Sequence, residues 1–446
     1  MPAKNRIFVL LLAVFMIFSM ISCGESPAEM PVTETPDASA APTVPEIPEA
    51  PEGSAEPEAP AEATIAGLPV SKINIIYPAA DSNGESAFAR EIGSAIADSY
   101  GVTVPVLPDN EAVREESKLL VGNCAAVAGP TLPAYLTNGE SCLVAENNAV
   151  QVTGVDKLGL YGAVQEFISR IRAAGGENLE LPLAEIFTAE HETTRVMTFN
   201  VLGSQKNYER TTRVKTMITN YMPDSLGLQE ADQSWINILQ GLIIDQNLPY
   251  EIVGEYAQPG SKGACSAILY RTDKFTLLDS GTRWLSPTPD VSSRFDGAQS
   301  YRMCSYAVLQ NKETGKTFVH INTHLDTNTH LQGKTRNQQA EVLAGIIQNF
   351  REYPVIVTGD FNSRPNTEPH KLMHEIGLVS SGDVAVQKHG NETFHDYGEA
   401  APDCIIDYIF IDPDQAAATN YRVCNEKING NYASDHHPVI ADVIYW

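Results

Sequence analysis

Acids, amides and histidines recur beside β-rich runs in the second half of this chain. Four motifs end such a run in one of these residues, and a fifth motif precedes a run. They are RVMTFN at 195–200, LGLQE at 226–230, INTHLD at 321–326, VTGDFN at 357–362 and SDHHP at 434–438. Layered α/β proteins gather functional groups at the ends of their strands. The five motifs, in this order, therefore predict one active site.

These side chains predict a metal-assisted reaction. A cluster of carboxylates repels itself and is costly to bury, and a hard divalent cation offsets that repulsion. Oxygen ligands favour Mg²⁺ or Mn²⁺ over Zn²⁺. Histidines add groups that move protons near neutral pH, so the set suits attack of water on phosphorus. The oxygen donors are Asn200, Glu230, Asp360, Asn362, Asp407 and Asp435, and the imidazoles are His324 and His436.

The motifs resemble those of the endonuclease/exonuclease/phosphatase superfamily, which includes DNase I-like nucleases, sphingomyelinases and inositol-phosphate phosphatases. The resemblance covers about residues 194–446. It implies a four-layered α/β-sandwich of the DNase I-like type. It also implies hydrolysis of a phosphoester with a divalent metal, and leaves the substrate open among nucleic acids, phospholipid head groups and sugar or inositol phosphates.

Roles follow from the resemblance, motif by motif. It implies that Glu230 is the main metal ligand and that Asn200 and Asp435 contribute beside it. It implies that Asp360 orients or deprotonates the attacking water and that Asn362 contacts the phosphate. Any of these residues alone has a structural explanation, such as a helix-start carboxylate or a turn; it is their joint occurrence that favours function.

The two imidazoles receive distinct roles from the same resemblance. His436 polarises the scissile phosphate or serves as acid or base, and Asp407 orients it, as carboxylates commonly do. His324 is expected to be the acid for the leaving oxygen, and Arg302 to steady the phosphate. Asp326 is equally well interpreted as a ligand or as a loop anchor.

One departure concerns the orientation of His324. Many family members place a glutamate shortly before the strand that here reads SAILY at 266–270, and that glutamate orients the histidine. The residues at 263–265 are Gly-Ala-Cys, with no acid. Either Asp326 or the backbone could orient His324 instead. The other histidines, His320, His330, His370, His374, His389 and His395, are expected at the surface or beside the site.

Strands with interleaved helices are predicted to position these residues. Two sheets packed face to face, with helices outside, would satisfy the pattern. Strand-like runs occur at 196–201, 267–270, 305–310, 317–322, 355–358, 407–411 and 439–443, and helical spacing at 211–221, 234–242 and 335–350. The catalytic domain is expected to span residues 193–446.

A smaller α+β domain is predicted at 66–190. Strands are expected at 72–77, 102–104, 118–121, 141–144 and 149–154, and helices at 86–100 and 158–171. LLVG at 119–122 and VTGVDKLGLYG at 152–162 resemble the accessory domain that precedes catalytic domains in several glycoside hydrolase families. The resemblance implies a glycan partner through residues 70–190, and a scaffold without a ligand explains the domain equally well.

The N-terminus predicts export and anchoring. Lys4 and Arg6 precede the apolar run 7–20, and SMISC at 19–23 resembles a bacterial lipoprotein signal, which implies lipidation at Cys23; a plain signal peptide or anchor helix is the alternative. Residues 24–65 are a Pro/Ala/Glu-rich tether expected to be disordered. The protein is expected on the outer face of a bacterial cell membrane, held by its lipid.

The charge balance of the chain limits the classes of substrate that it is expected to bind. The formal net charge is -26. Residues 1–192 hold 9 Lys+Arg and 27 Asp+Glu, a net of -18, and the remainder holds 21 and 29, a net of -8. Nonspecific nucleic-acid binding normally needs a basic face, so small or lipid phosphoesters are favoured over duplex DNA. The six cysteines after Cys23 are either small buried residues or disulfide partners.

Two other functions compete with phosphoester hydrolysis. A non-catalytic, glycan-binding surface lipoprotein with a vestigial phosphoesterase fold would be expected to have lost metal ligands, and none is missing from the five motifs. A glycoside hydrolase needs two acids flanking a sugar cleft, and no such pair is evident in residues 70–190.

Overall fold

The computed structural model describes residues 62–446, apart from 112–116, 126, 128, 131, 133–135, 147, 261 and 328–332. The predicted leader, Cys23, nearly all of the tether at 24–65, and His330 therefore lie outside the described residues. Within the described part, no helix has the length and apolar character needed to cross a bilayer.

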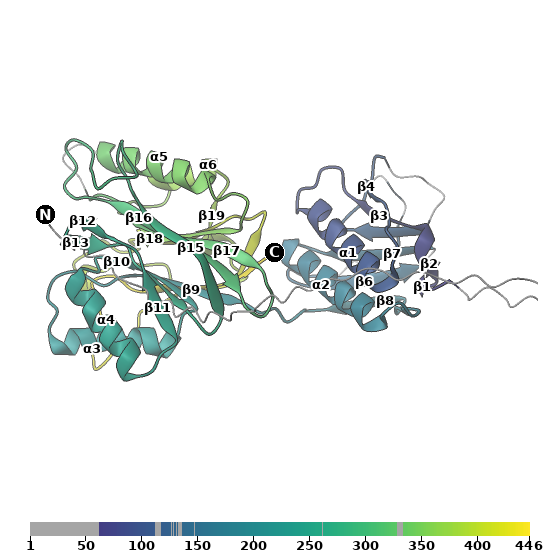
Figure 1. Cartoon of the computed structure of the whole chain (residues 1–446), viewed down its shortest axis with the longest axis horizontal. Helices are drawn as coiled ribbons and strands as arrows, with labels where there is room; N and C mark the ends of the chain where they lie inside the picture. The colour runs from purple at the N-terminus through teal and green to yellow at the C-terminus, as the bar shows by residue number, and fades with distance from the viewer. Residues whose placement is uncertain are drawn as a thin grey trace, which may run out of the picture. The chain divides into compact units, whose positions relative to one another are not determined.

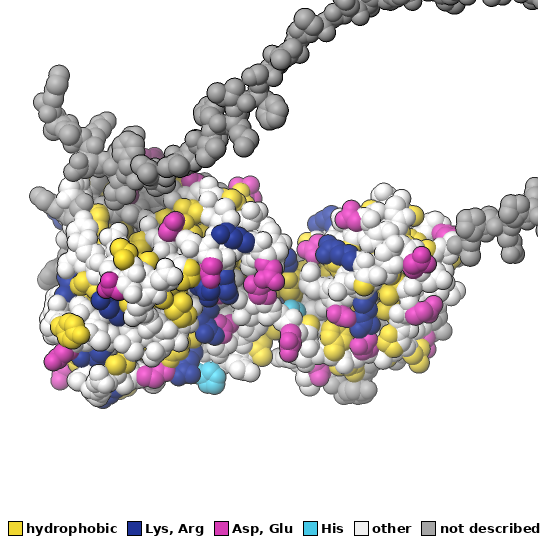
Figure 2. All heavy atoms as spheres, turned by 60° about the horizontal axis from the view of Figure 1, so that its bottom comes forward, with side chains coloured by type: hydrophobic (Ala, Val, Ile, Leu, Met, Phe, Trp, Pro, Cys, Tyr) yellow, Lys and Arg dark blue, Asp and Glu magenta, His cyan; other side chains and the backbone are white. Residues whose placement is uncertain are grey.

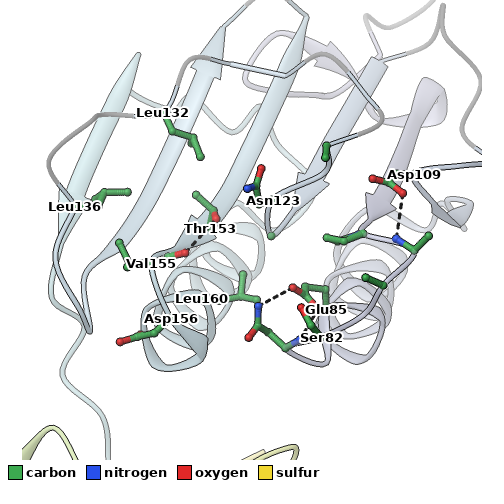
Figure 3. A pocket seen from close by; sticks show the side chains of 17 residues that line it. Ser82, Glu85, Asp109, Asn123, Leu132, Leu136, Thr153, Val155, Asp156 and Leu160 are labelled. Carbon is green, nitrogen blue, oxygen red and sulfur yellow. Dashed lines mark hydrogen bonds between the residues drawn. The ribbon is translucent and has the colours of Figure 1, made fainter.

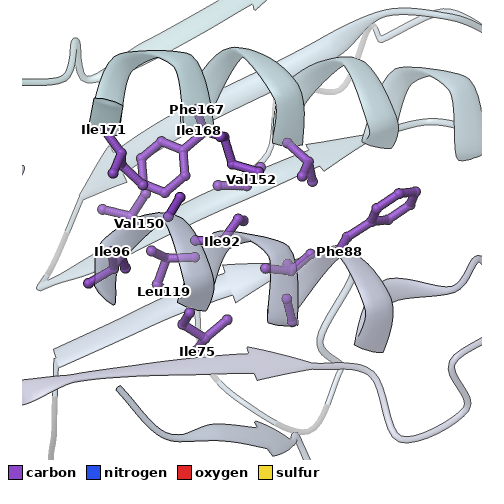
Figure 4. Close-up of a cluster of buried hydrophobic side chains, with 14 of the residues drawn as sticks. Ile75, Phe88, Ile92, Ile96, Leu119, Val150, Val152, Phe167, Ile168 and Ile171 are labelled. Atoms are coloured by element: carbon purple, nitrogen blue, oxygen red, sulfur yellow. The ribbon is translucent and has the colours of Figure 1, made fainter. Parts of the chain in front are cut away.

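The first described segment contains a six-stranded sheet of order β4-β3-β5-β7-β6-β8. Helices α1 (Glu85–Tyr100) and α2 (Lys157–Ala174) pack on one face of this sheet. The apolar side chains of α1 recur one turn apart, at Phe88, Ile92 and Ile96, and form a buried stripe (Figure 4). The strands are β3 (Ile73–Tyr77), β4 (Val106–Pro108), β5 (Ser117–Val121), β6 (Ser141–Glu146), β7 (Ala149–Gly154) and β8 (Ala184–Phe187), preceded by the short β1 (Thr64–Ile65), β2 (Leu68–Pro69) and η1 (Val70–Lys72).

The prediction of a strand at 102–104 was wrong. The strand that pairs with β3 is β4, which begins at Val106. Pro105 has no N–H to donate to a ladder, and its carbonyl instead accepts from Ile75 N at 2.9 Å. Regular pairing therefore starts after the proline. The other strands and helices predicted in this segment are confirmed, with ends that differ by a few residues.

The second segment contains two larger sheets. One has the order β11-β14-β10-β9-β23-β22-β20, and the other has the order β15-β16-β17-β18-β21-β19. The strands of the first sheet are β9 (Thr194–Asn200), β10 (Ser225–Gln229), β11 (Tyr250–Val253), β14 (Ile268–Arg271), β20 (Gln387–His389), β22 (Ala416–Val423) and β23 (Val439–Tyr445). Those of the second are β15 (Phe275–Trp284), β16 (Met303–Asn311), β17 (Thr317–His324), β18 (Val355–Asp360), β19 (Val379–Ser380) and β21 (Asp407–Ile411). A separate ribbon pairs β12 (Tyr256–Gln258) with β13 (Lys262–Cys265).

These two sheets pack face to face and carry helices on their outer faces (Figure 1). Helices α3 (Tyr208–Tyr221) and α4 (Gln233–Asp245) cover the first sheet. Helices α5 (Lys334–Gln348) and α6 (Glu368–Glu375) cover the second, and the short α7 (Ser381–Val384) and η2 (Asp396–Gly398) lie in connections. The four-layered α/β-sandwich predicted from the sequence is therefore confirmed.

The six cysteines in the described part of the chain are all buried and unpaired. Burial raises the pKa of the Cys265 and Cys304 thiols to about 12, so both stay protonated near neutral pH. Of the two explanations offered by the sequence, small buried residues rather than disulfide partners is the one that this structure bears out.

Candidate active site

Strand register brings three predicted site residues into one row. His324 ends β17 and pairs directly with Asp360, which ends the parallel strand β18. Asp360 in turn pairs with Asp407, the first residue of the antiparallel strand β21. The facing sheet ends at the same place, because Asn200 closes β9 opposite Gln229 of β10, and Glu230 follows. Both sheets thus present their predicted site residues along one edge of the sandwich.

Asp360 lies at the centre of this group and is almost fully buried. Its Oδ1 accepts from the backbone N–H of Asn362 at 2.8 Å, and its Oδ2 accepts from Asn200 Nδ2, on the facing sheet, at 2.9 Å. Burial, together with the nearby Asp407 carboxylate, raises the pKa of Asp360. A carboxyl with a raised pKa is a suitable general base, as predicted for activation of water.

His436 and Asp407 form a buried dyad. His436 Nδ1 lies 2.9 Å from Asp407 Oδ2, and His436 Nε2 lies 3.7 Å from Asp360 Oδ2. Burial by itself would lower the pKa of His436, but Asp407 and Asp360 raise it to about 10. The imidazole is therefore cationic at neutral pH, and its geometry agrees with the predicted orientation by Asp407.

His324 has a different environment from His436. Its Nε2 lies 3.0 Å from Asn362 Nδ2 and 3.3 Å from Asp360 Oδ2. Its buried Nδ1 has no hydrogen-bond partner among the described residues, so neither Asp326 nor the backbone there orients the ring. Burial, followed by the charges of Arg302 and His436, lowers the pKa of His324 well below its usual value. A neutral His324 beside a cationic His436 makes His436 the better proton donor.

Glu230 and Asn200 form the half of the site that belongs to the first sheet. Asn200 Nδ2 donates to Glu230 Oε1 at 3.3 Å, and Gly203 N donates to Glu230 Oε2 at 2.7 Å. The carboxylate keeps lone pairs for a cation and is partly exposed. Both Glu230 (φ 59°) and Asn362 (φ 46°) adopt left-handed backbone conformations. Such strain persists where the surrounding structure fixes it, commonly at functional sites.

Asp435 lies next to His436 in the connection before β23. Its Oδ1 accepts from Ser434 Oγ at 3.0 Å, and Ser434 Oγ also lies 2.7 Å from the carbonyl oxygen of Asn200. The carbonyl of Asp435 accepts from the N–H of His395 at 3.1 Å. Ser434 thus joins the two segments that carry the predicted metal ligands Asn200 and Asp435, and Asp435 is partly exposed.

Arg302 and Asp326 lie on the side of the site near His324. Arg302 Nε is buried without a partner among the described residues, and burial lowers its pKa while Asp326, Asp360 and Glu230 act to raise it. A guanidinium with unused donors beside these carboxylates fits the predicted phosphate contact. Asp326 Oδ2 accepts from Gln299 N at 2.9 Å, so Asp326 anchors a loop. This agrees with one of the two roles that the sequence offered for it.

Arg210 is an important residue that the sequence did not reveal. It is 2% exposed, and its guanidinium donates to five backbone carbonyls. Four of them belong to residues 201–205, directly after Asn200, and the fifth is Ala433, directly before Ser434. Arg210 therefore fixes two site loops. An arginine near the start of a helix gives no signal of such a role.

A second cation near the site was also missed. Arg336, on the first turn of α5, donates through Nη1 to the carbonyl of Asn362. Burial lowers the pKa of Arg336, while Asp326 and Asp360 raise it. Its Nε has no partner within the described residues. Arg336 thus supports the segment that carries Asn362.

His320 was expected at the surface or beside the site, and it is at neither. It is fully buried between the two sheets, with Nδ1 2.6 Å from Ser225 Oγ and Nε2 2.7 Å from Thr358 Oγ1. It belongs to an inter-sheet polar layer in which Gln229 Nε2 donates to Asn322 Oδ1 across the sheets at 2.7 Å, while Gln229–Thr198 and Thr358–Asn322 hydrogen bonds link members within each sheet. The layer comprises Thr198, Ser225, Gln229, His320, Asn322 and Thr358.

The residues fit a divalent cation, although one cluster of ligand atoms at this edge is not the predicted ligand set. Ligand atoms of Asp360, Asp407 and His436 lie within 4.8 Å of one another. Because Asp407 already engages His436 Nδ1, these three suit proton transfer better than metal binding. The partly exposed oxygens of Glu230 and Asp435 are open to a hydrated cation such as Mg²⁺. A bound cation there would supply charge stabilisation for the phosphate.

Known proteins share this architecture. A sequence model of the Endonuclease/Exonuclease/phosphatase family matches residues 197–436, more than half of the chain. A structure of a Bacteroides vulgatus endonuclease/exonuclease/phosphatase is 29% identical, with a TM-score of 0.51, covering 57% of this chain and 99% of that one. The mannosyl-6-phosphatase of Bacteroides thetaiotaomicron is 26% identical, with a TM-score of 0.51, over 56% of this chain and 99% of that one.

A curated relative matches over only part of its length. Protein angel of Drosophila melanogaster is 29% identical over 164 residues, which is 36% of this chain and 44% of the relative. The chain thus spans less than half the length of that relative. The family match and the shared sandwich agree with the residues gathered at its edge, and enzymes of this family generally depend on a divalent metal. The chain therefore belongs to the endonuclease/exonuclease/phosphatase family and has the fold of its phosphoesterases.

Proposed function

We propose that this protein is a Mg²⁺- or Mn²⁺-dependent phosphoric ester hydrolase that acts on a small phosphoester. The observation that carries the proposal is the row His324–Asp360–Asp407, closed by Glu230 and Asn200 from the facing sheet. Glu230, Asn200 and Asp435 hold the cation. Asp360 orients or deprotonates the water, and the cationic His436, held by Asp407, stabilises the phosphate and protonates the leaving oxygen.

The surface charge favours a small substrate over duplex DNA. The catalytic segment is net acidic, and Figure 2 shows basic and acidic side chains intermixed on the face in view. The similarity to a mannosyl-6-phosphatase supports a sugar phosphate as the first class to test. In that case Arg302 and Asn362 contact the phosphate, and neighbouring loops contact the sugar.

The test is turnover of p-nitrophenyl phosphate, bis(p-nitrophenyl) phosphate and mannose 6-phosphate with Mg²⁺, Mn²⁺ or EDTA. Metal-dependent turnover that is lost in Asp435→Ala, but kept in the control Asp296→Ala at an exposed acid, would support the proposal. The preferred substrate separates monoesterase from diesterase. Absence of turnover with every divalent metal would contradict the proposal and favour the non-catalytic glycan-binding lipoprotein.

Anchoring through Cys23 completes the proposed setting. The basic start, the apolar run and the terminal Cys23 support a diacylated lipoprotein on the outer face of a bacterial membrane. Intact mass measurement of the membrane-extracted protein tests this. A lipid mass that persists in Cys23→Ser, or its absence from the wild type, would contradict lipidation at this residue.

A second activity, binding of a saccharide by residues 70–190, is favoured by a hollow of about 710 Å³ (Figure 3). The hollow lies at the carboxyl ends of β3, β5 and β7, where the chain passes from one side of β3 to the other. In open α/β sheets ligands bind at such a switch point.

The chemistry of the hollow favours a neutral, hydroxyl-rich ligand. The described residues that line it include Glu85, Asn123 and Asp156 and no lysine or arginine. The N-terminal ends of α1 and α2 each already hold a carboxylate of the chain. Asp81 accepts from Ser86 N at 2.8 Å, and Asp156 accepts from Gly159 N at 2.8 Å. A phosphate would meet repulsion at these helix ends. Calorimetry with neutral oligosaccharides, compared with Asn123→Ala, tests the activity, and heats unchanged by the variant would refute it.

A further inference from the structure

Two histidines and an aspartate form a second cluster. It lies on the helix-covered face of the six-stranded sheet that has β15 at one edge and β19 at the other. His370 and His374 lie one turn apart on α6, so their side chains share a face of the helix. Asp383 comes from α7. One ligand atom from each residue lies within 4.8 Å of the other two.

Packing holds the imidazole of His370 in place. The ring of His370 is buried, 5.2 Å from the Tyr408 ring and 5.6 Å from the Phe410 ring, and 4.7 Å from the ring of His374. The pairing of Ser380 with Phe410 places α7 directly after a strand fixed to β21. The donors therefore come from two elements that the same sheet positions.

The polar atoms of this cluster are available to a ligand. Within the described residues, no side-chain hydrogen bond or ion pair engages His370, His374 or Asp383, whereas His320, His324 and His436 all have polar partners. Two imidazole nitrogens and one carboxylate oxygen form a borderline donor set, which suits Zn²⁺ and not Mg²⁺ or Ca²⁺.

We propose that His370, His374 and Asp383 form a Zn²⁺ site, distinct from the predicted Mg²⁺ site. Three ligands and a water complete a tetrahedron whose ligand atoms are about 3.3–3.6 Å apart, as bond lengths of ~2.0–2.2 Å require. The exposed His374 and Asp383 can close the remaining distance by small rotations. The ion joins α6 to α7 and supports Tyr408, the residue after Asp407.

The test uses the whole protein after removal of metals with a chelator. Zn²⁺ is titrated against a chromophoric competitor for the wild type, His374→Ala, Asp383→Asn and the control His389→Ala, an exposed histidine outside the cluster. The wild type and the control should bind one more equivalent of Zn²⁺ than the two cluster variants. Zn²⁺ held by the active-site oxygens is common to all four proteins and cancels.

Two further readouts separate this site from the active site. Co²⁺ should give the wild type the intense visible absorption of a tetrahedral N/O site, and His374→Ala should lose that band. Mg²⁺-supported hydrolysis should stay within about twofold of wild type in His374→Ala, because the variant alters none of the residues proposed to form the active site. Equal Zn²⁺ stoichiometry in all four proteins, or a Co²⁺ band that survives in His374→Ala, would overturn the proposal.

Discussion

The inter-sheet polar layer and the candidate active site are both buried, and both take side chains from strand β17. His320, Asn322 and His324 occupy alternate positions along β17 and therefore lie on the same face of their sheet. The first two lie midway along the strand, where hydroxyl and amide partners surround them and no member of the layer is charged. His324 lies at the strand end, among carboxylates.

The two regions differ in how many of their buried polar atoms have a hydrogen-bond partner. Among the described residues, the layer leaves one buried oxygen, Gln229 Oε1, without a partner, whereas the candidate site leaves five atoms: His324 Nδ1, Arg302 Nε, Asp326 Oδ1, Arg336 Nε and Asp407 Oδ1. A buried polar atom without a partner costs about 1–3 kcal/mol, so the candidate site sacrifices stability. Such a cost is expected where groups must be free to meet a cation and a phosphate, and the layer has no such demand.

Asp360→Asn should have the largest effect on kcat, without a matching loss of stability. Loss of the general base should lower kcat by about 10²–10⁴-fold. Removal of a charge that burial and Asp407 disfavour should leave the metal-free protein as stable as wild type or more so. Kinetics and urea unfolding in EDTA measure both effects. A large loss of stability would show that Asp360 is structural, like the layer.

Arg210→Lys should lower both activity and stability. An ammonium cannot reach five carbonyls at once, and a hydrogen bond from a charged group contributes about 1.5–3 kcal/mol, so the loss should be at least about 3 kcal/mol. Unfolding in urea and the Mg²⁺ dependence of turnover are the measurements. Arg213→Lys is the matched control, because Arg213 Nε donates to the single carbonyl of Tyr432. Equal effects in the two variants would contradict the role given to Arg210.

His320→Gln should change stability and leave kcat unaltered. Burial lowers the pKa of His320 from its ordinary 6.5 to about 3. Between these values the unfolded chain binds more protons, so this histidine makes the protein less stable as pH falls below 6.5. The variant should lose about 1–3 kcal/mol at neutral pH and show a flatter decline toward pH 4. An unchanged acid slope would exclude His320 as its source.

Asp407→Asn acts at the opposite end of the pH range from His320→Gln. Because the folded pKa of His436 is about 10 against an ordinary 6.5, its stabilisation is fully present below pH 6.5 and is lost as pH rises toward 10. Without the Asp407 charge that pKa should fall and the alkaline slope should flatten. Urea unfolding in EDTA between pH 7 and 10 measures it, and a slope equal to wild type would contradict the dyad.

Strand periodicity and motif order were readable in the sequence. The β-rich runs that end in GDFN and LQE predicted strands β18 and β10 and the acids at their ends, because local spacing and turn chemistry are encoded locally. The glycine of LGLQE has a reason that only the fold reveals. A Cβ at Gly227 would lie 2.2 Å from Thr358 Oγ1 and 2.4 Å from Asn322 Oδ1, atoms of the polar layer.

The sequence by itself determined the sandwich, the family and the residues that gather at the candidate active site, since each motif carries its own strand and its own functional group. Only the tertiary structure decided what each group meets. His320 and His324 are the same residue type, four positions apart, and their neighbours across the sheets make one a neutral structural link and the other a site residue. Arg210 gained its importance in the same way, because carbonyls from two distant loops converge on it and no local pattern records that convergence.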